Sequence, residues 1–177
     1  MIEFPRAVYD EIVSRAYAGG EAEVCGILAG TTVNDGEAGV GGDAGVDDGA
    51  GVGGDAGVDD GAGVDGRSDV EEVTVVERAY AADNVAETPQ IRYRIDPEEQ
   101  LELLEEIEAA GLDVVGFYHS HPTGPTEPSE TDAAEATWPD RSYVICALDG
   151  YPFVGSWRWR ADAEAFERET VAVRGER

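Results

Sequence analysis

The chain contains no lysine. All 12 of its basic residues are arginine, against 39 aspartates and glutamates, and the formal net charge is −27 over 177 residues. Binding to nucleic acid or to an anionic membrane needs clustered Lys or Arg, so this composition argues against both kinds of partner. The absence of lysine also leaves no side-chain amine to which a ubiquitin-like modifier could be conjugated.

The shortage of basic residues also indicates the salt concentration to which the protein is adapted. An acidic excess of this size causes self-repulsion in dilute buffer, and salt screens most of it when the Debye length shrinks to about 3 Å near 1 M. The composition therefore predicts a halophilic protein, adapted to a high-salt cytoplasm. An ordinary acidic protein is the alternative interpretation.

Long apolar runs are also missing. No run approaches the roughly eighteen residues of a transmembrane helix, and residues 1–5 lack the basic and apolar regions of a signal peptide. We expect a cytoplasmic protein.

Cysteine is scarce. Cys25 and Cys146 lie in two separate strand-like runs, without a C-x-x-C pair or a set of four cysteines, so a thiolate zinc site is not supported. We interpret both as small buried residues, and a disulfide between them stays open.

The only two histidines, His119 and His121, stand one residue apart at the end of an apolar run. Residues i and i+2 of a strand point to the same face, so both imidazoles can aim at one divalent metal. A catalytic zinc usually takes three protein ligands and a water. Asp132, eleven residues after His121, is the best candidate for the third ligand.

Simpler interpretations exist for each part of this pattern. The two histidines could be half-exposed residues at a strand end, and Ser129-x-x-Asp132 has the form of a helix N-cap with an acidic residue three positions later. The two interpretations are compatible, because a carboxylate in the first helical turn can face a metal while the serine fixes where the helix starts.

At these residues the sequence resembles the JAMM (MPN-plus) metalloproteases. Their motif is an upstream glutamate, then His-x-His, seven residues, Ser, two residues and Asp. His121 is followed by seven residues, Ser129, two residues and Asp132, and the segment 23–28 (EVCGIL) resembles the upstream glutamate segment. The resemblance covers roughly residues 1–34 and 69–160. It implies an α/β fold of the cytidine-deaminase-like type.

The chemistry of such a site is hydrolytic. Zinc held by His119, His121 and Asp132 lowers the pKa of its bound water to about 7. Glu23 is the candidate general base, and Ser129 is the candidate donor to the oxyanion of the tetrahedral intermediate. Without the motif, an exposed carboxylate at a strand start would be the better interpretation of Glu23.

The residues alone indicate metal-assisted amide hydrolysis. The resemblance implies an isopeptidase that cuts after the C-terminal Gly-Gly of a ubiquitin-like modifier and, in a halophilic archaeal setting, a desampylase-like removal of small archaeal modifier proteins. Two alternatives are a peptidase that processes a small sulfur-carrier protein or its cysteine adduct, and a non-catalytic MPN scaffold. Relatives of the scaffold type have lost motif residues that this chain retains. Neither the oligomeric state nor the linkage preference is fixed by the sequence.

Other metal-enzyme classes lack the residues that they need. Zinc deaminases use H-x-E with P-C-x-x-C, and zincins use H-E-x-x-H on a helix. None of these patterns is present in the chain. A metal-dependent hydrolase barrel would need about 250 residues.

Residues 35–68 differ in composition from the rest of the chain. Residues 39–50 recur unchanged at 51–62, with Gly and Asp dominant and no aromatic residue. Such a stretch cannot bury enough apolar surface to offset its ordering entropy, so we predict a disordered insertion between two strands. A calcium-binding repeat is the alternative, but the period of twelve does not match the nonapeptide consensus.

The remaining sequence predicts one catalytic domain, residues 1–177, with a mixed β-sheet flanked by helices. Apolar periodicity, caps and breakers predict helices at 5–18, from Asp96 to Gly111 with Leu101, Leu104 and Ile107 on one face, from about Ser129, and at 161–170. They predict strands at 23–29, 70–80, 91–95, 114–118, 143–148 and 153–159.

Overall fold

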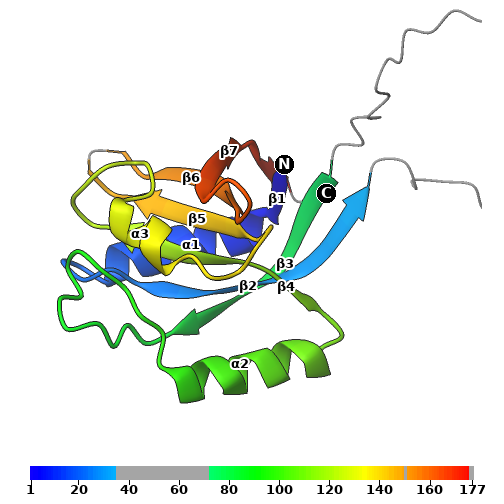
Figure 1. Ribbon diagram of the computed structural model, residues 1–177, viewed down its shortest axis with the longest axis horizontal. Helices are drawn as coiled ribbons and strands as arrows, with labels where there is room; N and C mark the ends of the chain where they lie inside the picture. Colours follow the sequence, from blue (N-terminus) through cyan, green and yellow to red (C-terminus); the bar gives the residue numbers. More distant parts are fainter. Residues whose placement is uncertain (35–71, 150, 176–177) are drawn as a thin grey trace, which may run out of the picture.

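The chain folds as a curled mixed β-sheet with helices against both of its faces, as Figure 1 shows. The computed structural model describes residues 1–34, 72–149 and 151–175, so the predicted insertion at 35–68 lies outside the described residues. The described elements are β1 (Ile2–Pro5), α1 (Arg6–Ala18), β2 (Cys25–Asn34), β3 (Glu72–Ala82), α2 (Pro97–Ala109), β4 (Asp113–His121), α3 (Glu130–Glu135), β5 (Ser142–Ala147), β6 (Phe153–Arg160), β7 (Ala165–Glu169) and β8 (Val171–Arg174). The predicted α/β class, a mixed sheet flanked by helices, is confirmed.

Within the described residues the strand order is β7-β6-β5-β4-β2-β3-β1-β8. Strand β4 is parallel to β5, β1 is parallel to β3 and β8, and the other pairs are antiparallel. The two edge strands, β7 and β8, are separated only by Thr170 in the sequence. The sheet therefore curls back on itself, and Ile2 N donates to Thr170 O at 2.9 Å.

Strands β2 and β3 form a long antiparallel pair. The pairing runs from Cys25 opposite Ala82 to Asn34 opposite Glu72, with a register shift between Ala29 and Gly30. The strand predicted at 23–29 thus extends five residues further than the apolar run indicated.

The sheet separates two apolar clusters. One packs against α1 and includes Phe4, Ile12, Leu28 and Tyr118. The other lies on the face covered by α2 and includes Ile27, Tyr80, Ile107, Phe117, Tyr143 and Trp159. Because side chains alternate along β4, Phe117 and the two histidines share the α2 face.

The caps of α2 agree with the prediction. Asp96 is the N-cap and accepts from Glu98 N at 2.9 Å and Glu99 N at 3.3 Å, and Pro97 is the first helical residue. Gly111, just beyond the helix, has φ of +72°, a conformation that favours glycine. The predicted apolar face is only partly correct, because Leu101 is 58% exposed whereas Ile107 is buried.

Two predicted elements are wrong. Residues 91–95 form no strand, and the described segment has a single bridge, Asn84 to Ile95. Its alternating pattern does not bury one face, since Ile91 is 72% exposed. Residues 161–170, predicted as a helix, instead form a turn with Glu164 at φ of +46° followed by β7.

The packing of one aromatic residue accounts for the second error. The Phe166 ring lies 4.9 Å from the Trp159 ring and 5.3 Å from the Tyr143 ring, measured between centroids. Strand pairing of β7 with β6 places Phe166 there, and this tertiary contact outweighs the helix propensity of the neighbouring Ala and Glu residues.

Cys25 and Cys146 are both buried free thiols.

A buried arginine joins distant strands where the sheet curls closed. The Arg158 side chain on β6 is 5% exposed, and it donates to Thr74 Oγ1 at 2.7 Å and to Glu169 Oε2 at 3.3 Å. It also pairs with Glu72 on β3. Arg158 therefore compensates the carboxylate of Glu169, which is only 8% exposed.

We predict that Arg158→Ala lowers the free energy of unfolding by about 3 kcal/mol. The variant removes the nearer of two cations from the buried Glu169 carboxylate and leaves the Met1 ammonium, 3.7 Å from Glu169 Oε2, as the other. Urea unfolding in molar salt measures the change. The matched control is Arg160→Ala on the same strand, whose pairs with Asp140 and Glu167 are exposed and which should cost less than about 1 kcal/mol. Equal losses in the two variants would contradict the role of Arg158.

Candidate metal centre

Strand β4 delivers both histidines to one point on the α2 face of the sheet. It lies between β2, where Cys25 pairs with His119, and β5, where Ile145 pairs with His119. His119 is 1% exposed and His121 is 5% exposed. The interior position of the strand therefore removes both imidazoles from solvent.

The third predicted ligand comes from the short helix α3. Ser129 is its N-cap, and the Ser129 Oγ accepts from Asp132 N at 3.1 Å while the Ser129 N–H donates to Asp132 Oδ2 at 2.6 Å. The Ser129 hydroxyl also donates to the same Oδ2 at 2.6 Å. This capping box fixes where the helix begins and turns the Asp132 carboxylate toward β4.

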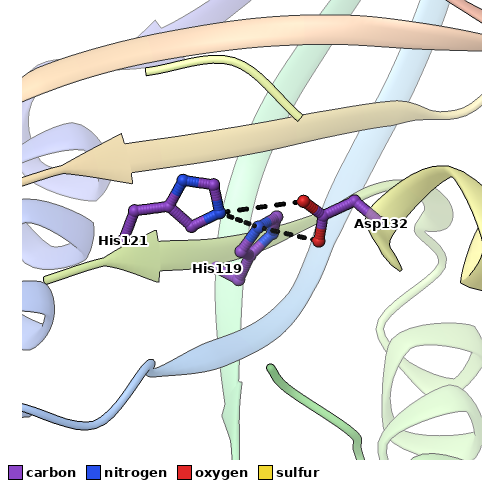
Figure 2. Close-up of side chains that lie close together, drawn as sticks. All are labelled: His119, His121 and Asp132. Carbon is purple, nitrogen blue, oxygen red and sulfur yellow. Dashed lines mark hydrogen bonds and ion pairs between the residues drawn. The ribbon is translucent and has the colours of Figure 1, made fainter. Parts of the chain in front are cut away.

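The three side chains converge, as Figure 2 shows. His119 Nε2 lies 3.0 Å from His121 Nε2 and 3.2 Å from Asp132 Oδ1, and His121 Nε2 lies 3.7 Å from Asp132 Oδ2. Ligand bonds of about 2.0–2.1 Å in tetrahedral geometry place ligand atoms about 3.3 Å apart. The donor set and its spacing therefore fit a zinc ion.

The two imidazoles are oriented in different ways. His121 Nδ1 lies 2.7 Å from Pro125 O. A carbonyl oxygen only accepts, so Nδ1 donates to it and Nε2 is the nitrogen that faces the centre. His119 Nδ1 is buried and has no hydrogen-bond partner among the described residues. Its ring instead stacks on Tyr93, with centroids 4.5 Å apart and planes at 23°.

Burial and hydrogen bonds act in opposite directions on the three ionisable side chains of the cluster. Burial lowers the pKa of His119 in spite of its bond to Asp132. Burial would raise the pKa of Asp132, but hydrogen bonds from both histidines and Ser129 outweigh it and hold this pKa well below its usual range. Burial likewise opposes a charge on His121, yet Asp132, Pro125 and Glu23 raise its pKa. An ionised aspartate beside imidazole nitrogens is the state in which such groups bind a metal.

Glu23 lies beside the cluster, two residues before the first residue of β2, and is 6% exposed. Its backbone is fixed on one side by Glu23 N donating to Pro89 O at 2.6 Å and Asn84 Nδ2 donating to Glu23 O at 2.9 Å. On the other side, Val24 N donates to Ser120 Oγ and Ser120 N donates to Val24 O, each at 2.9 Å. Ser120 thus ties the glutamate segment to the histidine strand.

The Glu23 carboxyl is a weaker acid than an ordinary glutamate side chain. Burial raises its pKa to about 7, with Asp132 adding to the shift and His121 opposing it. A carboxylate with this pKa can take up and release a proton near neutral pH. The predicted exposed alternative for Glu23 is therefore not what the structure shows.

The structure brings together every side chain that the motif singled out. His119, His121 and Asp132 form the cluster, Glu23 interacts electrostatically with two of its members, and Ser129 bonds to the third. The sequence interpretation missed Tyr93, Asn84, Ser120 and Pro125. Ser120 carried a signal, since a polar residue between two strand histidines must point to the opposite, buried face.

Residues 5–162 match the protein family described as prokaryotic homologs of the JAB domain. The chain belongs to this family. The predicted resemblance to JAMM-type proteins is thereby confirmed. Among the described residues, no helix of this JAB-family chain combines the length and apolarity that a membrane crossing requires.

Relatives of the JAB-family chain agree with this assignment. The chain is 42% identical over 102 residues to a protein of Haloferax volcanii named "Desampylase". The aligned part covers 58% of the chain and 70% of the relative. It is 43% identical over 75 residues, 42% of the chain and 50% of the relative, to a Thermus thermophilus protein named "Probable TtuB-protein conjugate cleaving protease". A Pyrococcus furiosus protein named "Desampylase" is 48% identical over 42 residues, 24% of the chain and 30% of the relative.

Two solution structures share the fold. A Desulfitobacterium hafniense protein aligns with a TM-score of 0.70 at 24% identity over 99% of the chain and 94% of its own. A Salinibacter ruber protein aligns with a TM-score of 0.59 at 27% identity over 97% and 91%. These alignments extend over nearly the full length of all three chains.

We predict that Glu23→Gln stabilises the metal-free protein in a pH-dependent way. The raised pKa of Glu23 means that ionising it in the folded state is unfavourable, so wild type loses stability as the pH rises from about 4.5 to about 7. At pH 8 the variant, which has no carboxyl to ionise, should therefore be more stable than wild type by up to about 3 kcal/mol. At pH 4 it should gain nothing.

Thermal melts of chelator-treated protein at both pH values measure this effect. The control is Glu21→Gln, two residues away and exposed, which should melt like wild type. A gain that is equal at pH 4 and pH 8 would show that burial does not raise the Glu23 pKa.

Proposed function

We propose that this JAB-family chain is a zinc-dependent isopeptidase that hydrolyses the amide bond after the C-terminal Gly-Gly of a ubiquitin-like modifier. The observation that carries the proposal is the buried set of His119, His121 and Asp132 beside a carboxyl, Glu23, whose pKa is close to neutral. The names of the Haloferax and Thermus relatives support the substrate class.

The residues present suit zinc. Two neutral imidazole nitrogens and one ionised carboxylate are a common three-ligand set for a catalytic zinc, which keeps one further position for water. Zinc supplies a Lewis acid for the amide carbonyl and lowers the pKa of water to about 7. The hydrogen bonds from His121 to Pro125 and from Ser129 to Asp132, which orient the two side chains, support this role.

Glu23 moves the proton. It accepts a proton from the attacking water as the new carbon–oxygen bond forms, and it gives that proton to the leaving nitrogen as the carbon–nitrogen bond breaks. The second proton of the water also passes to the amine, so the products are the carboxylate of the modifier and the ammonium group of the target. In the metal-free protein, burial raises the pKa of this carboxyl to about 7, which makes it a stronger base than an exposed glutamate.

Ser129 supplies a hydrogen-bond donor next to Asp132. Its hydroxyl bonds to Asp132 in the structure, and its backbone N–H bonds to the same carboxylate oxygen. The N–H alone can retain Asp132, so the hydroxyl is free to turn toward the oxyanion of the tetrahedral intermediate. Loss of one such donor costs about 10²–10³ in rate.

We predict that purified protein binds one zinc per chain and cleaves a Gly-Gly isopeptide conjugate in a chelator-sensitive reaction. Glu23→Gln keeps the shape of the side chain but cannot carry the proton, so kcat should fall by about 10²–10⁴ with zinc content unchanged. Zinc analysis and single-turnover cleavage of a lysine-linked modifier test both parts, with Glu21→Gln as the control.

Three outcomes would contradict the assignment. A folded protein that binds no zinc removes the proposed function altogether. Retention of more than about a tenth of the activity by Glu23→Gln, far above a general-base effect, means that Glu23 is not the base. Cleavage of linear adducts alone, with lysine-linked ones untouched, favours processing of a sulfur-carrier protein instead.

We also predict that the cleavage rate rises from dilute buffer to molar salt. The net charge of −27 repels an acidic conjugate at long range, and salt shortens that range to about 3 Å near 1 M. Initial rates from 0.1 to 2 M KCl, with circular dichroism to check the fold at each point, measure the effect. A rate that stays constant while the fold is intact would refute it.

A further inference from the structure

Every donor and acceptor of the Asn84 side-chain amide takes part in a hydrogen bond. It lies just beyond β3, in the segment that joins β3 to α2, which we call the connecting segment (residues 83–95). Its Nδ2 donates to Glu23 O at 2.9 Å and to Arg92 O at 3.0 Å. Its Oδ1 accepts from Ala86 N at 3.0 Å and from Arg94 N at 3.1 Å. Two donors and two acceptors are all that an asparagine amide can offer.

One of these bonds reaches the proposed base across 61 residues of sequence. Together with the bond from Glu23 N to Pro89 O, it means that both backbone groups of Glu23 are held by the connecting segment. The position of the Glu23 carboxyl over the cluster therefore depends on where that segment lies.

Two further bonds hold the residues on either side of Tyr93. Asn84 bonds the carbonyl of Arg92 and the N–H of Arg94, so the backbone at Tyr93 is fixed before and after the ring. That ring stacks on His119, the imidazole whose Nδ1 has no partner in the described part of the chain. Stacking thus takes the place of the hydrogen bond that usually orients a metal-binding histidine.

A simple turn does not account for this pattern. The bond from Ala86 N to Oδ1 is a local one, of the kind that asparagine makes in turns. The bonds to Glu23, Arg92 and Arg94 close no turn of that kind, and they join the two parts of the centre that come from outside β4 and α3.

We infer that Asn84 is a positioning residue that couples the proposed general base to the metal ligand His119, through the backbone of Glu23 and the ring of Tyr93. The inference deepens the proposed function, and its kinetic consequence rests on that function. Its structural consequence does not, because the bonds and the ring stack are present without metal or substrate.

The test uses the chain's only two histidines as probes. In metal-free protein, the ring current of Tyr93 should shift the imidazole protons of His119 upfield, and Tyr93→Leu should abolish that shift. Asn84→Ala should lose a large part of it, as should Asn84→Asp, which keeps the side-chain shape but lacks both donors. Imidazole proton–carbon correlation spectra, assigned with His121→Gln, give the readout.

The matched control is Asp96→Ala, which removes the N-cap of α2 at the end of the connecting segment. It should lower the Tm by a few degrees and leave the His119 resonance in place. In zinc-loaded protein, Asn84→Ala should lower kcat by about 10–100-fold with KM little changed, because a small displacement of reacting groups has that effect. The control should keep the wild-type kcat.

Two results would overturn the inference. One is a folded Asn84→Ala or Asn84→Asp protein with the wild-type His119 resonance, and the other is a control that moves the resonance as much as they do. If wild type binds no zinc and cleaves nothing but the resonance behaves as expected, the proposed function fails and the positioning role stands.

Discussion

The loss of water around four ionisable side chains is the constraint on which this structure depends. His119, His121 and Asp132 share one buried point, and Glu23 lies beside it. In such a medium each group can ionise only if its neighbours supply the opposite charge or a hydrogen bond. Desolvation thus keeps His119 neutral and pushes the Glu23 pKa up, while the bonds to Asp132 keep that carboxylate ionised. These are the states that metal binding and proton transfer require.

The secondary-structure elements that carry these side chains differ in how firmly the rest of the fold holds them. Strand β4 is held on both sides by other strands, so the histidines are fixed by the ladder itself. Helix α3 spans only six residues, and the position of Asp132 depends on the capping box at Ser129. A partly exposed ion pair from Arg92 in the connecting segment to Glu135 is a further contact of this helix. The histidine pair is therefore the rigid half of the centre, and the aspartate is the half whose position depends on a few polar bonds.

The sequence predicted what depends on spacing within one element. The His-x-His pair follows from strand alternation, and Ser129-x-x-Asp132 predicted both the helix start and the inward carboxylate. Asn84 and Tyr93 were missed because their roles depend on bonds to Glu23 and contact with His119, far away in sequence. The helix predicted at 161–170 failed for the same reason. Phe166 gains more from contact with Trp159 than its neighbours gain from helical propensity, and no local pattern reports that partner.

The antiparallel pair of β2 and β3 separates the candidate metal centre from the ends of the two strands at Asn34 and Glu72. At one end Cys25 faces Ala82 next to the metal centre, and at the other Asn34 faces Glu72. Ten residues of strand put about 30 Å between those ends. Because the entropy of closing a loop grows only slowly with loop length, we expect a change in the number of residues between Asn34 and Glu72 to have little effect at the other end of the strand pair. The same point offers protein engineers a place to graft a reporter or a second domain onto the scaffold.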